Sequence, residues 1–368
     1  MVNKQKVITN MTIEIAMPLY KPSPRLKSVL VALAMQTDRD FYIVMYNDTR
    51  PEDKEEIALD EQIIEEVRQE YGLNITLNQN SQNLGYMKNM RQIFAKATGD
   101  ILVLLADDDI VTVDYIELVR KAFSKKEVGI VARPYYWFTD DMKRPIRFSG
   151  YIFNKMKLVK FDSSKPVMVN ECLHSAGQLS ELAYRREYLK GMPFEEDMFT
   201  AHVYPFLYVF KNHPCAYLSH PTLAVSINSS QTHKDIYDPS PMKQWLDLLD
   251  RVVVEAEHQP MVKELKEFNN TDFYGLAEIK NYGTYKELFG EIGNYVKYRP
   301  KNLINPYFYL FSVGSIIIPR KILIALVDWY KNKVLAKKIE KMNIDFSVYP
   351  FKECEPLWQY SEYGELRE

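Results

Sequence analysis

Cysteine is scarce in this sequence, with three residues among 368. Cys172, Cys215 and Cys354 lie far apart and form no CxxC pair, which argues against a disulfide framework or a cysteine-based zinc site. Residues 1–10 contain no apolar core of a signal peptide, so we expect no secretory leader. The chain also has no run of about 20 uncharged apolar residues, so we expect no membrane-spanning helix.

A large excess of one charge is absent as well. The 47 basic and 49 acidic side chains leave a net charge of −2, so we expect no nucleic-acid partner. Hydrophobic residues make up 46% and charged residues 26% of the chain, as in a globular protein with a substantial core. The length suits one large domain with a smaller appendage, or two modest domains.

Strand-like and helix-like segments alternate over the first 132 residues. Short apolar runs predict strands at 12–19, 41–46, 73–78, 101–106 and 128–132. The run ILVLLA at 101–106 is apolar throughout, as a strand covered by helices on both faces requires. The alternation predicts an α/β domain with a mostly parallel sheet and helices on both faces.

Polar residues follow three of the expected strands. Pro18 and Tyr20 lie at the end of the first strand, and Asn47 and Asp48 at the end of the second. The fourth strand ends in the triplet 107–109. Ligands of such sheets bind beyond the carboxyl ends of the strands, so the three clusters predict one site at that edge.

The triplet Asp107, Asp108 and Asp109 is the most informative of these clusters. Neighbouring carboxylates repel one another, and this repulsion is costly at a buried strand end. A divalent cation, Mn²⁺ or Mg²⁺, offsets the repulsion and binds readily between carboxylates and a diphosphate. In an extended chain Asp107 and Asp109 point to the same side and are candidate metal ligands. Alternatively, Asp108 or Asp109 caps the helix that follows.

The order of these motifs resembles glycosyltransferase family 2, whose members have the GT-A fold with a Rossmann-like sheet. The similar segments are IAMPLYKP, YIVMYNDT and NLGYMKNMRQIFAKATGDILVLLADDD. The DDD triplet is most similar to the abequosyltransferase-like branch. The resemblance is clear over 12–132, weaker over 133–235 and absent beyond 240. It implies a metal-dependent, inverting, hexosyltransferase-type enzyme that uses a nucleotide-diphosphate sugar.

The resemblance also implies a donor site built from the strand ends and from the start of the helix after the third strand. Its nucleotide-sugar-binding residues would be Pro18, Tyr20, Asp48, Asn83, Gly85, Asn89, Arg91, Asp107 and Asp108. Asp107 and Asp109 would hold the metal, with His233 as an added ligand. Arg91 could instead face solvent, and His233 could lie in a surface loop. Asn47 stands where the family often has aspartate, a departure that weakens or redirects recognition of the base.

Inversion requires a base that activates the acceptor hydroxyl. The family's Glu-Asp pair resembles Glu196 and Asp197, so we predict Asp197 as the base, with Glu196 as the alternative. Otherwise the two carboxylates only favour the N-terminus of an aromatic-rich helix. His202, about one turn later on that helix, and Ser180 are candidate contacts to the acceptor, although a structural role would also explain His202.

The sequence divides into a catalytic domain over 1–240, a helical extension over 241–300 and a basic amphipathic segment over 301–368. The segment 303–340 either associates peripherally with a membrane or packs on protein. We expect a cytoplasmic protein, with the inner face of the cell membrane as its second expected location.

The expected activity serves the synthesis of a surface polysaccharide or a lipid-linked oligosaccharide, with a saccharide or lipid-linked acceptor. One alternative is a sugar-phosphate nucleotidyltransferase, which the loop YKPSPRLK disfavours because it contains no glycine. The other is a non-catalytic nucleotide-sugar-binding protein of the same fold.

Overall fold

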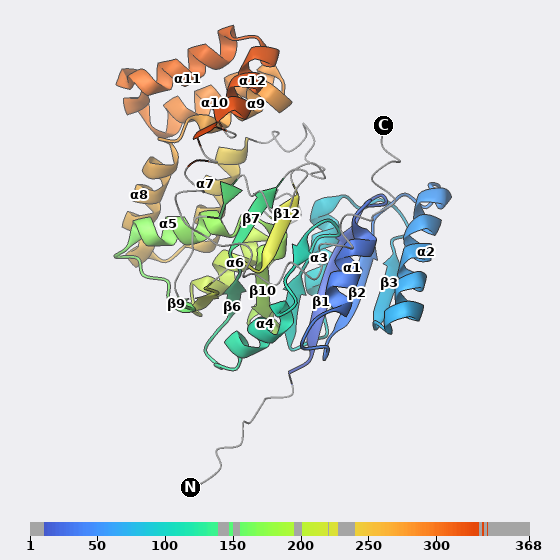
Figure 1. Cartoon of the computed structure of the whole chain (residues 1–368). Coiled ribbons are helices and arrows are strands. Elements are labelled where there is room, and N and C mark those ends of the chain that lie inside the picture. The colour runs from blue at the N-terminus through green and yellow to red at the C-terminus, as the bar shows by residue number, and fades with distance from the viewer. Residues whose placement is uncertain are drawn as a thin grey trace.

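The computed structural model describes residues 11–138, 147–149, 155–194, 201–219, 221–226, 240–330, 333, 334 and 337. Its main sheet is built from β1 (Ile13–Leu19), β2 (Tyr42–Asn47), β3 (Ile75–Gln79), β4 (Ile101–Leu104), β6 (Ile130–Ala132), β9 (Lys157–Val159), β10 (Leu182–Arg185) and β11 (Cys215–Tyr217). The strand order is β3-β2-β1-β4-β10-β6-β11-β9. Strands β3, β2, β1 and β4 run parallel, and β10 is antiparallel to both of its neighbours. The predicted mostly parallel sheet is therefore confirmed (Figure 1).

A smaller sheet lies beside the main one. It consists of β5 (Ile110–Val111), β12 (Leu223–Ser226), β7 (Tyr135–Phe138) and β8 (Arg147–Phe148), in the order β5-β12-β7-β8. Strand β5 begins one residue after Asp109 and pairs with β12. The aspartate triplet thus spans the passage from the main sheet to the small one.

Helices cover both faces of the main sheet. The core of one face contains α1 (Leu26–Ala34), α2 (Lys54–Tyr71), α4 (Tyr115–Phe123) and residues of the small sheet. The core of the other face contains α3 (Tyr86–Lys96), α5 (Pro166–Ser175) and α6 (Val203–Phe210). Side chains alternate along a strand, so Ile15 and Met17 of β1 enter the first core while Ala16 enters the second.

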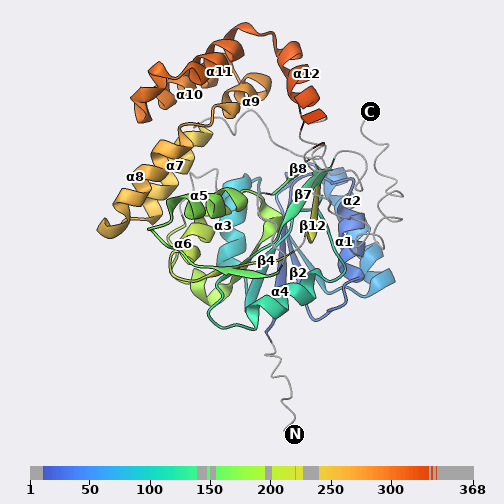
Figure 2. The ribbon, with the colours of Figure 1, turned by 60° about the vertical axis from the view of Figure 1, so that its left-hand side comes forward.

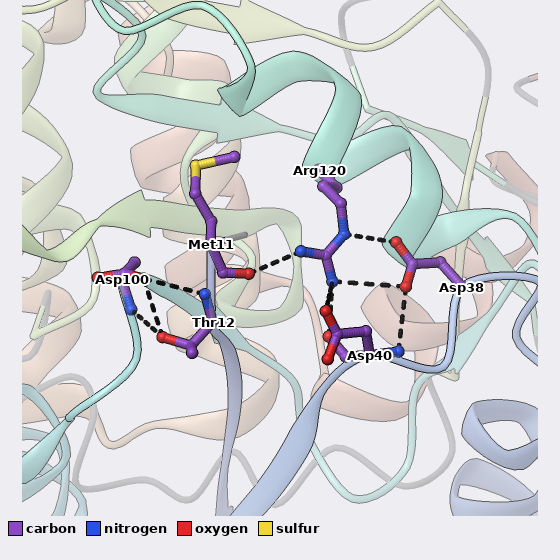
Figure 3. Close-up of polar contacts among 6 residues, drawn as sticks. All are labelled: Met11, Thr12, Asp38, Asp40, Asp100 and Arg120. Atoms are coloured by element: carbon purple, nitrogen blue, oxygen red, sulfur yellow. Dashed lines mark hydrogen bonds and ion pairs between the residues drawn. The ribbon is translucent and has the colours of Figure 1, made fainter. Parts of the chain in front are cut away.

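The amino ends of the parallel strands are held together by polar contacts (Figure 3). Arg120 of α4 donates from Nε to Asp38 Oδ2 and from Nη1 to the carbonyl of Met11, each at 2.6 Å. The amide and the hydroxyl of Thr12 both donate to Asp100 Oδ2 at 3.0 Å. These contacts join the start of β1 to the residues before β2 and β4, at the edge opposite the polar clusters.

A helical region follows the α/β domain. It contains α7 (Pro241–Val252), α8 (Gln259–Asn269), α9 (Tyr274–Tyr282), α10 (Tyr285–Tyr298), α11 (Pro306–Ile317) and α12 (Arg320–Tyr330). Helix α7 fastens it to the domain, since Leu248 and Leu249 enter the second core while Met242 and Leu246 pack with Phe308 of α11. Within the residues described here, every helix is too short or too polar to span a bilayer. Figure 2 shows α9–α12 as a group beyond α7.

Candidate functional site

Asp48, directly after β2, organises the loop that leads into α3. Its Oδ1 accepts hydrogen bonds from the amide of Leu84 at 2.7 Å and from Asn80 Nδ2 at 2.8 Å. Its Oδ2 accepts from the amide of Gly85 at 2.8 Å and from Asn83 Nδ2 at 3.2 Å. Because both oxygens are engaged by the loop and the side chain is buried, Asp48 acts here by shaping the loop.

The other expected donor residues around this loop differ in exposure. Asn89 is buried and donates from Nδ2 to the carbonyl of Tyr46 at 3.1 Å, so it ties α3 to β2 from below the surface. Gly85 has φ of 77°, a left-handed conformation that favours glycine, immediately before α3. Four of the expected donor residues are accessible to solvent. Pro18 and Tyr20 are half-buried, while Asn83 and Arg91 are exposed. These accessible residues are the ones able to contact a ligand directly.

Asp109, which follows the turn after β4 and directly precedes β5, is buried and oriented by a distant segment of the chain. Its Oδ2 accepts from Ser180 Oγ at 2.6 Å and from Gln178 Nε2 at 2.8 Å. Ser180 Oγ in turn accepts from the amide of Ala106 at 2.8 Å. Ser180 has no exposed surface, so in this structure it positions Asp109 and does not face an acceptor. The Oδ1 atom of Asp109 is buried and has no hydrogen-bond partner among the described residues.

The negative charge of the aspartate triplet is not balanced by the positive charge of the described residues around it. Burial, followed by the charge of Asp108, raises the pKa values of Asp107 and Asp109 well above the ordinary range. Asp60 raises the pKa of Asp107 further, while the guanidinium of Arg25 lowers that of Asp109. A bound cation would relieve this repulsion.

The residues present fit a hard divalent cation that is only partly coordinated by protein. In the described ranges, no three His, Cys, Asp or Glu side chains are assembled as a metal-binding group. Asp109 nevertheless offers a buried carboxylate oxygen without a hydrogen-bond donor, beside the half-buried Asp107. Mg²⁺ is commonly held by one or two carboxylates together with phosphate oxygens, and this donor set matches that pattern.

Asp60 is a buried carboxylate in the middle of α2. It accepts from Asn47 Nδ2 at 3.2 Å, and its Oδ1 has no hydrogen-bond partner among the described residues. It shares the buried face of α2 with Ile63, Ile64 and Val67, where an apolar residue is the usual occupant. Burial raises the pKa of Asp60 to about 7.

We expect Asp60→Asn to stabilise the metal-free protein at high pH only. With a folded pKa of about 7 against an ordinary value of 3.8, Asp60 binds more protons in the folded state than in the unfolded state between these limits. The contribution of this proton binding to the free energy of unfolding is fully present below pH 3.8 and is lost as the pH rises through 7. Urea unfolding with EDTA should show a gain of up to about 4 kcal/mol at pH 8 and little at pH 4. An equal gain at both pH values would contradict a raised pKa.

His202 lies before the helix on which it was expected. Helix α6 begins at Val203, and His202 precedes it. Its Nε2 lies 2.9 Å from the carbonyl of Gly177 and its Nδ1 lies 2.7 Å from Tyr86 Oη. A carbonyl only accepts, so Nε2 carries the proton and the hydroxyl of Tyr86 donates to Nδ1. Burial lowers the pKa of His202 to about 4, which keeps this ring neutral near pH 7.

The pair Tyr86–His202 connects three parts of the site. Tyr86 is the first residue of α3, directly after the loop held by Asp48, and Gly177 precedes the residues that orient Asp109. The remaining predicted residues, Glu196, Asp197 and His233, lie outside the described residues. His202 is the second described residue after the segment that contains Glu196 and Asp197.

Four residues of this site were not found from the sequence: Arg25, Asp60, Tyr86 and Gln178. Asp60 left a detectable sign, because it interrupts the apolar stripe of its helix. Gln178 left none, since only the fold brings it to Asp109, 69 positions away.

Comparisons with known proteins show what this chain is similar to. Residues 14–181 match the family model described as Glycosyl transferase family 2. A search of the curated proteins finds no match. The crystal structure of S. aureus TarS 1–349 in complex with UDP is similar, with a TM-score of 0.58 and 15% identity, covering 90% of this chain and 92% of that one. Its complex with UDP-GlcNAc gives a TM-score of 0.58 at 14% identity, covering 88% and 92%.

A further crystal structure of S. aureus TarS, not restricted to residues 1–349, matches with a TM-score of 0.57 and 15% identity, covering 83% of this chain. This chain spans about half of that protein, 53% of its length. Together the likenesses confirm the expected GT-A-like fold with a helical C-terminal region. The family match runs from β1 to Glu181 and so includes all three strand-end clusters and Ser180.

Proposed function

We propose that this protein is a glycosyltransferase that moves a sugar from a nucleotide-diphosphate sugar to an acceptor hydroxyl. The observation that carries the proposal is Asp109, a buried carboxylate with one unpaired oxygen between β4 and β5. It lies inside the segment that matches glycosyl transferase family 2. The structures of S. aureus TarS in complex with UDP and UDP-GlcNAc support a nucleotide-sugar donor.

The donor would lie across the three strand ends. Pro18 and Tyr20 would contact the nucleoside, and Asn83 with the loop at Gly85 would border the sugar nucleotide. Asp48 would act through this loop, whose amides it already holds. Such preorganisation lowers the entropic cost of binding the donor.

The departing diphosphate would be stabilised at the aspartate triplet. A bound Mn²⁺ or Mg²⁺ would supply Lewis-acid stabilisation of the leaving group. Asp109 would hold the cation directly, oriented by Ser180 and Gln178. The half-buried Asp107 would be a second ligand of the cation, and His233 is proposed as an added ligand.

We propose an inverting displacement in which Asp197 takes the proton of the acceptor hydroxyl, with Glu196 as the alternative base. Asp197→Asn should lower sugar transfer about 100-fold, because an amide cannot accept that proton. Glu196→Gln is the matched comparison and should have a smaller effect. The measurement is initial transfer rate at saturating donor; a larger loss in Glu196→Gln would exchange the two roles.

The acceptor is proposed to be a saccharide or a lipid-linked oligosaccharide in the synthesis of a cell-surface polymer. The enzyme would then work in the cytoplasm, at the inner face of the cell membrane, through peripheral association of the segment 303–340. The abequosyltransferase-like branch stays part of this proposal.

The experiment that tests the function is donor turnover by the purified full chain. We expect one nucleotide class among UDP-, GDP-, dTDP- and CDP-sugars, with UDP-GlcNAc tried first, to release free nucleotide when Mn²⁺ or Mg²⁺ is present. EDTA should abolish the release, because the diphosphate would lose its counter-charge. Binding of a nucleotide sugar without turnover in the presence of acceptor extracts would instead indicate a non-catalytic binding protein.

A further inference from the structure

The helical region exposes an unusual amount of apolar surface. Among the described residues, 14 of the 19 exposed large apolar side chains lie between Tyr282 and Tyr330. Monomeric proteins rarely leave a large contiguous apolar patch facing water, and such patches commonly mark binding surfaces.

The exposed apolar residues follow the period of the helices that carry them. On α11, Leu310 and Ile317 are 65% and 72% exposed, while Phe308 of the same helix is buried in the core. On α12, Leu323 is the buried residue, while Ile322, Leu326 and Trp329 are 50–58% exposed on the remaining surface. On each helix the exposed apolar residues therefore lie away from the residues that are buried, which are Phe308, Ser312 and Ser315 on α11 and Leu323 on α12.

We group the exposed apolar residues of these helices under the name α11–α12 surface and define it by six residues. These are Ile304, Leu310, Ile317, Ile322, Leu326 and Trp329. Ile304 ends the short helix η5 (Pro300–Ile304) that precedes α11 and is 85% exposed.

Basic residues accompany this surface. Between Lys297 and Lys337 the chain has eight basic residues and one acidic residue, whereas the whole chain has a net charge of −2. Lys301, Arg320 and Lys321 are exposed beside the apolar residues. Pairing this surface with a second copy of itself would bring like charges together, whereas anionic lipid head groups complement it.

We propose that the α11–α12 surface docks on a lipid bilayer that contains anionic lipids. The helices lie in the interface, with apolar side chains among the acyl chains and Trp329 at the level of the head groups. The described helices are too short or too polar to cross the bilayer, which agrees with this interfacial position.

The docking also orients the candidate site. Both views of the molecule show α9–α12 on the side toward which the carboxyl ends of β1 and β2 point (Figures 1 and 2). A lipid-linked acceptor would thus reach the strand ends from the bilayer; this consequence rests on the proposed function, whereas the docking itself does not.

The test is flotation of the full chain with vesicles of phosphatidylcholine, with and without phosphatidylglycerol. We expect at least about tenfold stronger binding to the anionic vesicles, weakened by added salt because exposed charges are screened. The double variant Leu310→Glu/Ile317→Glu should lose about tenfold in binding, since each change places a charge in the interface. Val167→Glu, which alters a residue on α5 that is 54% exposed, is the matched control and should bind as the parent protein does.

Two results would overturn the proposal. The first is absence of binding to anionic vesicles by a correctly folded chain, as judged by circular dichroism. The second is a concentration-dependent oligomer, detected by light scattering, that the parent protein forms and the double variant does not. That result would make the surface a contact between two copies of this chain. Hydrolysis of a soluble nucleotide sugar is measured separately and should be unchanged in the double variant, so failure of docking and failure of the proposed activity are distinguishable.

Discussion

Replacing Asp109 by asparagine should lower metal-dependent donor turnover about 1,000-fold, because the proposed metal site would lose its buried carboxylate. Ser180 and Gln178 would still surround the amide, so the loss reports charge and not a collapsed loop. The variant should not be less stable without metal, since burial disfavours the charged form of Asp109. Turnover is measured as nucleotide release, and stability by thermal unfolding with and without Mn²⁺.

Asp114→Asn is the matched control for this experiment. Asp114 precedes α4, and its Oδ1 accepts from the hydroxyl of Thr112 at 2.6 Å, five positions along the chain from Asp109. The same chemical change there should leave both turnover and the metal-induced rise in melting temperature intact. Normal turnover by Asp109→Asn would remove this residue from the proposed metal site.

Replacing Arg120 by alanine should lower the free energy of unfolding by about 3 kcal/mol, because it leaves a largely buried carboxylate without its partner. The side chains of Arg120 and Asp38 are 12% and 18% exposed and form an ion pair at 2.6 Å. Arg120 also donates hydrogen bonds to the carbonyls of Met11 and Asp40 (Figure 3). Its replacement therefore also removes a hydrogen bond at the start of β1. Urea unfolding measures the change.

The control is Lys27→Ala, which removes an exposed ion pair with Glu66. These side chains are 41% and 39% exposed at 3.0 Å, and such pairs contribute less than about 1 kcal/mol. Turnover per folded molecule should be unchanged in Arg120→Ala, because Arg120 contacts residues at the amino ends of β1 and β2, opposite the strand ends that precede Asp48 and Asp109. An Arg120→Ala protein as stable as the parent would show that the contacts in Figure 3 are dispensable.

The alternating strands and helices could be predicted because their patterns are local. A covered strand such as 101–104 must be apolar on both faces. These requirements act on neighbours in the chain, so the sequence displays them directly. The expected strands over the first 132 residues agree with β1, β2, β3, β4 and β6 to within a few residues.

The surroundings of the predicted residues could not be read in the same way. Asp48 was expected to bind the nucleotide sugar, and in the structure its carboxylate is engaged by four donors from the loop 80–85. Ser180 was expected near the acceptor, yet it lies under Asp109. Both arrangements arise from hydrogen bonds between segments more than 30 positions apart, which no local pattern encodes.

The amino-acid sequence alone determined the fold class and predicted the edge of the sheet at which we propose that a ligand binds, because strand periodicity and the polar strand ends follow from backbone geometry. Only the tertiary structure decided which oxygen of Asp109 is left unpaired, that Asp60 lies buried near the triplet, and that α11 and α12 turn apolar sides outward. The physical reason is that burial and charge coupling depend on distances through space, which are set when segments distant in sequence pack together.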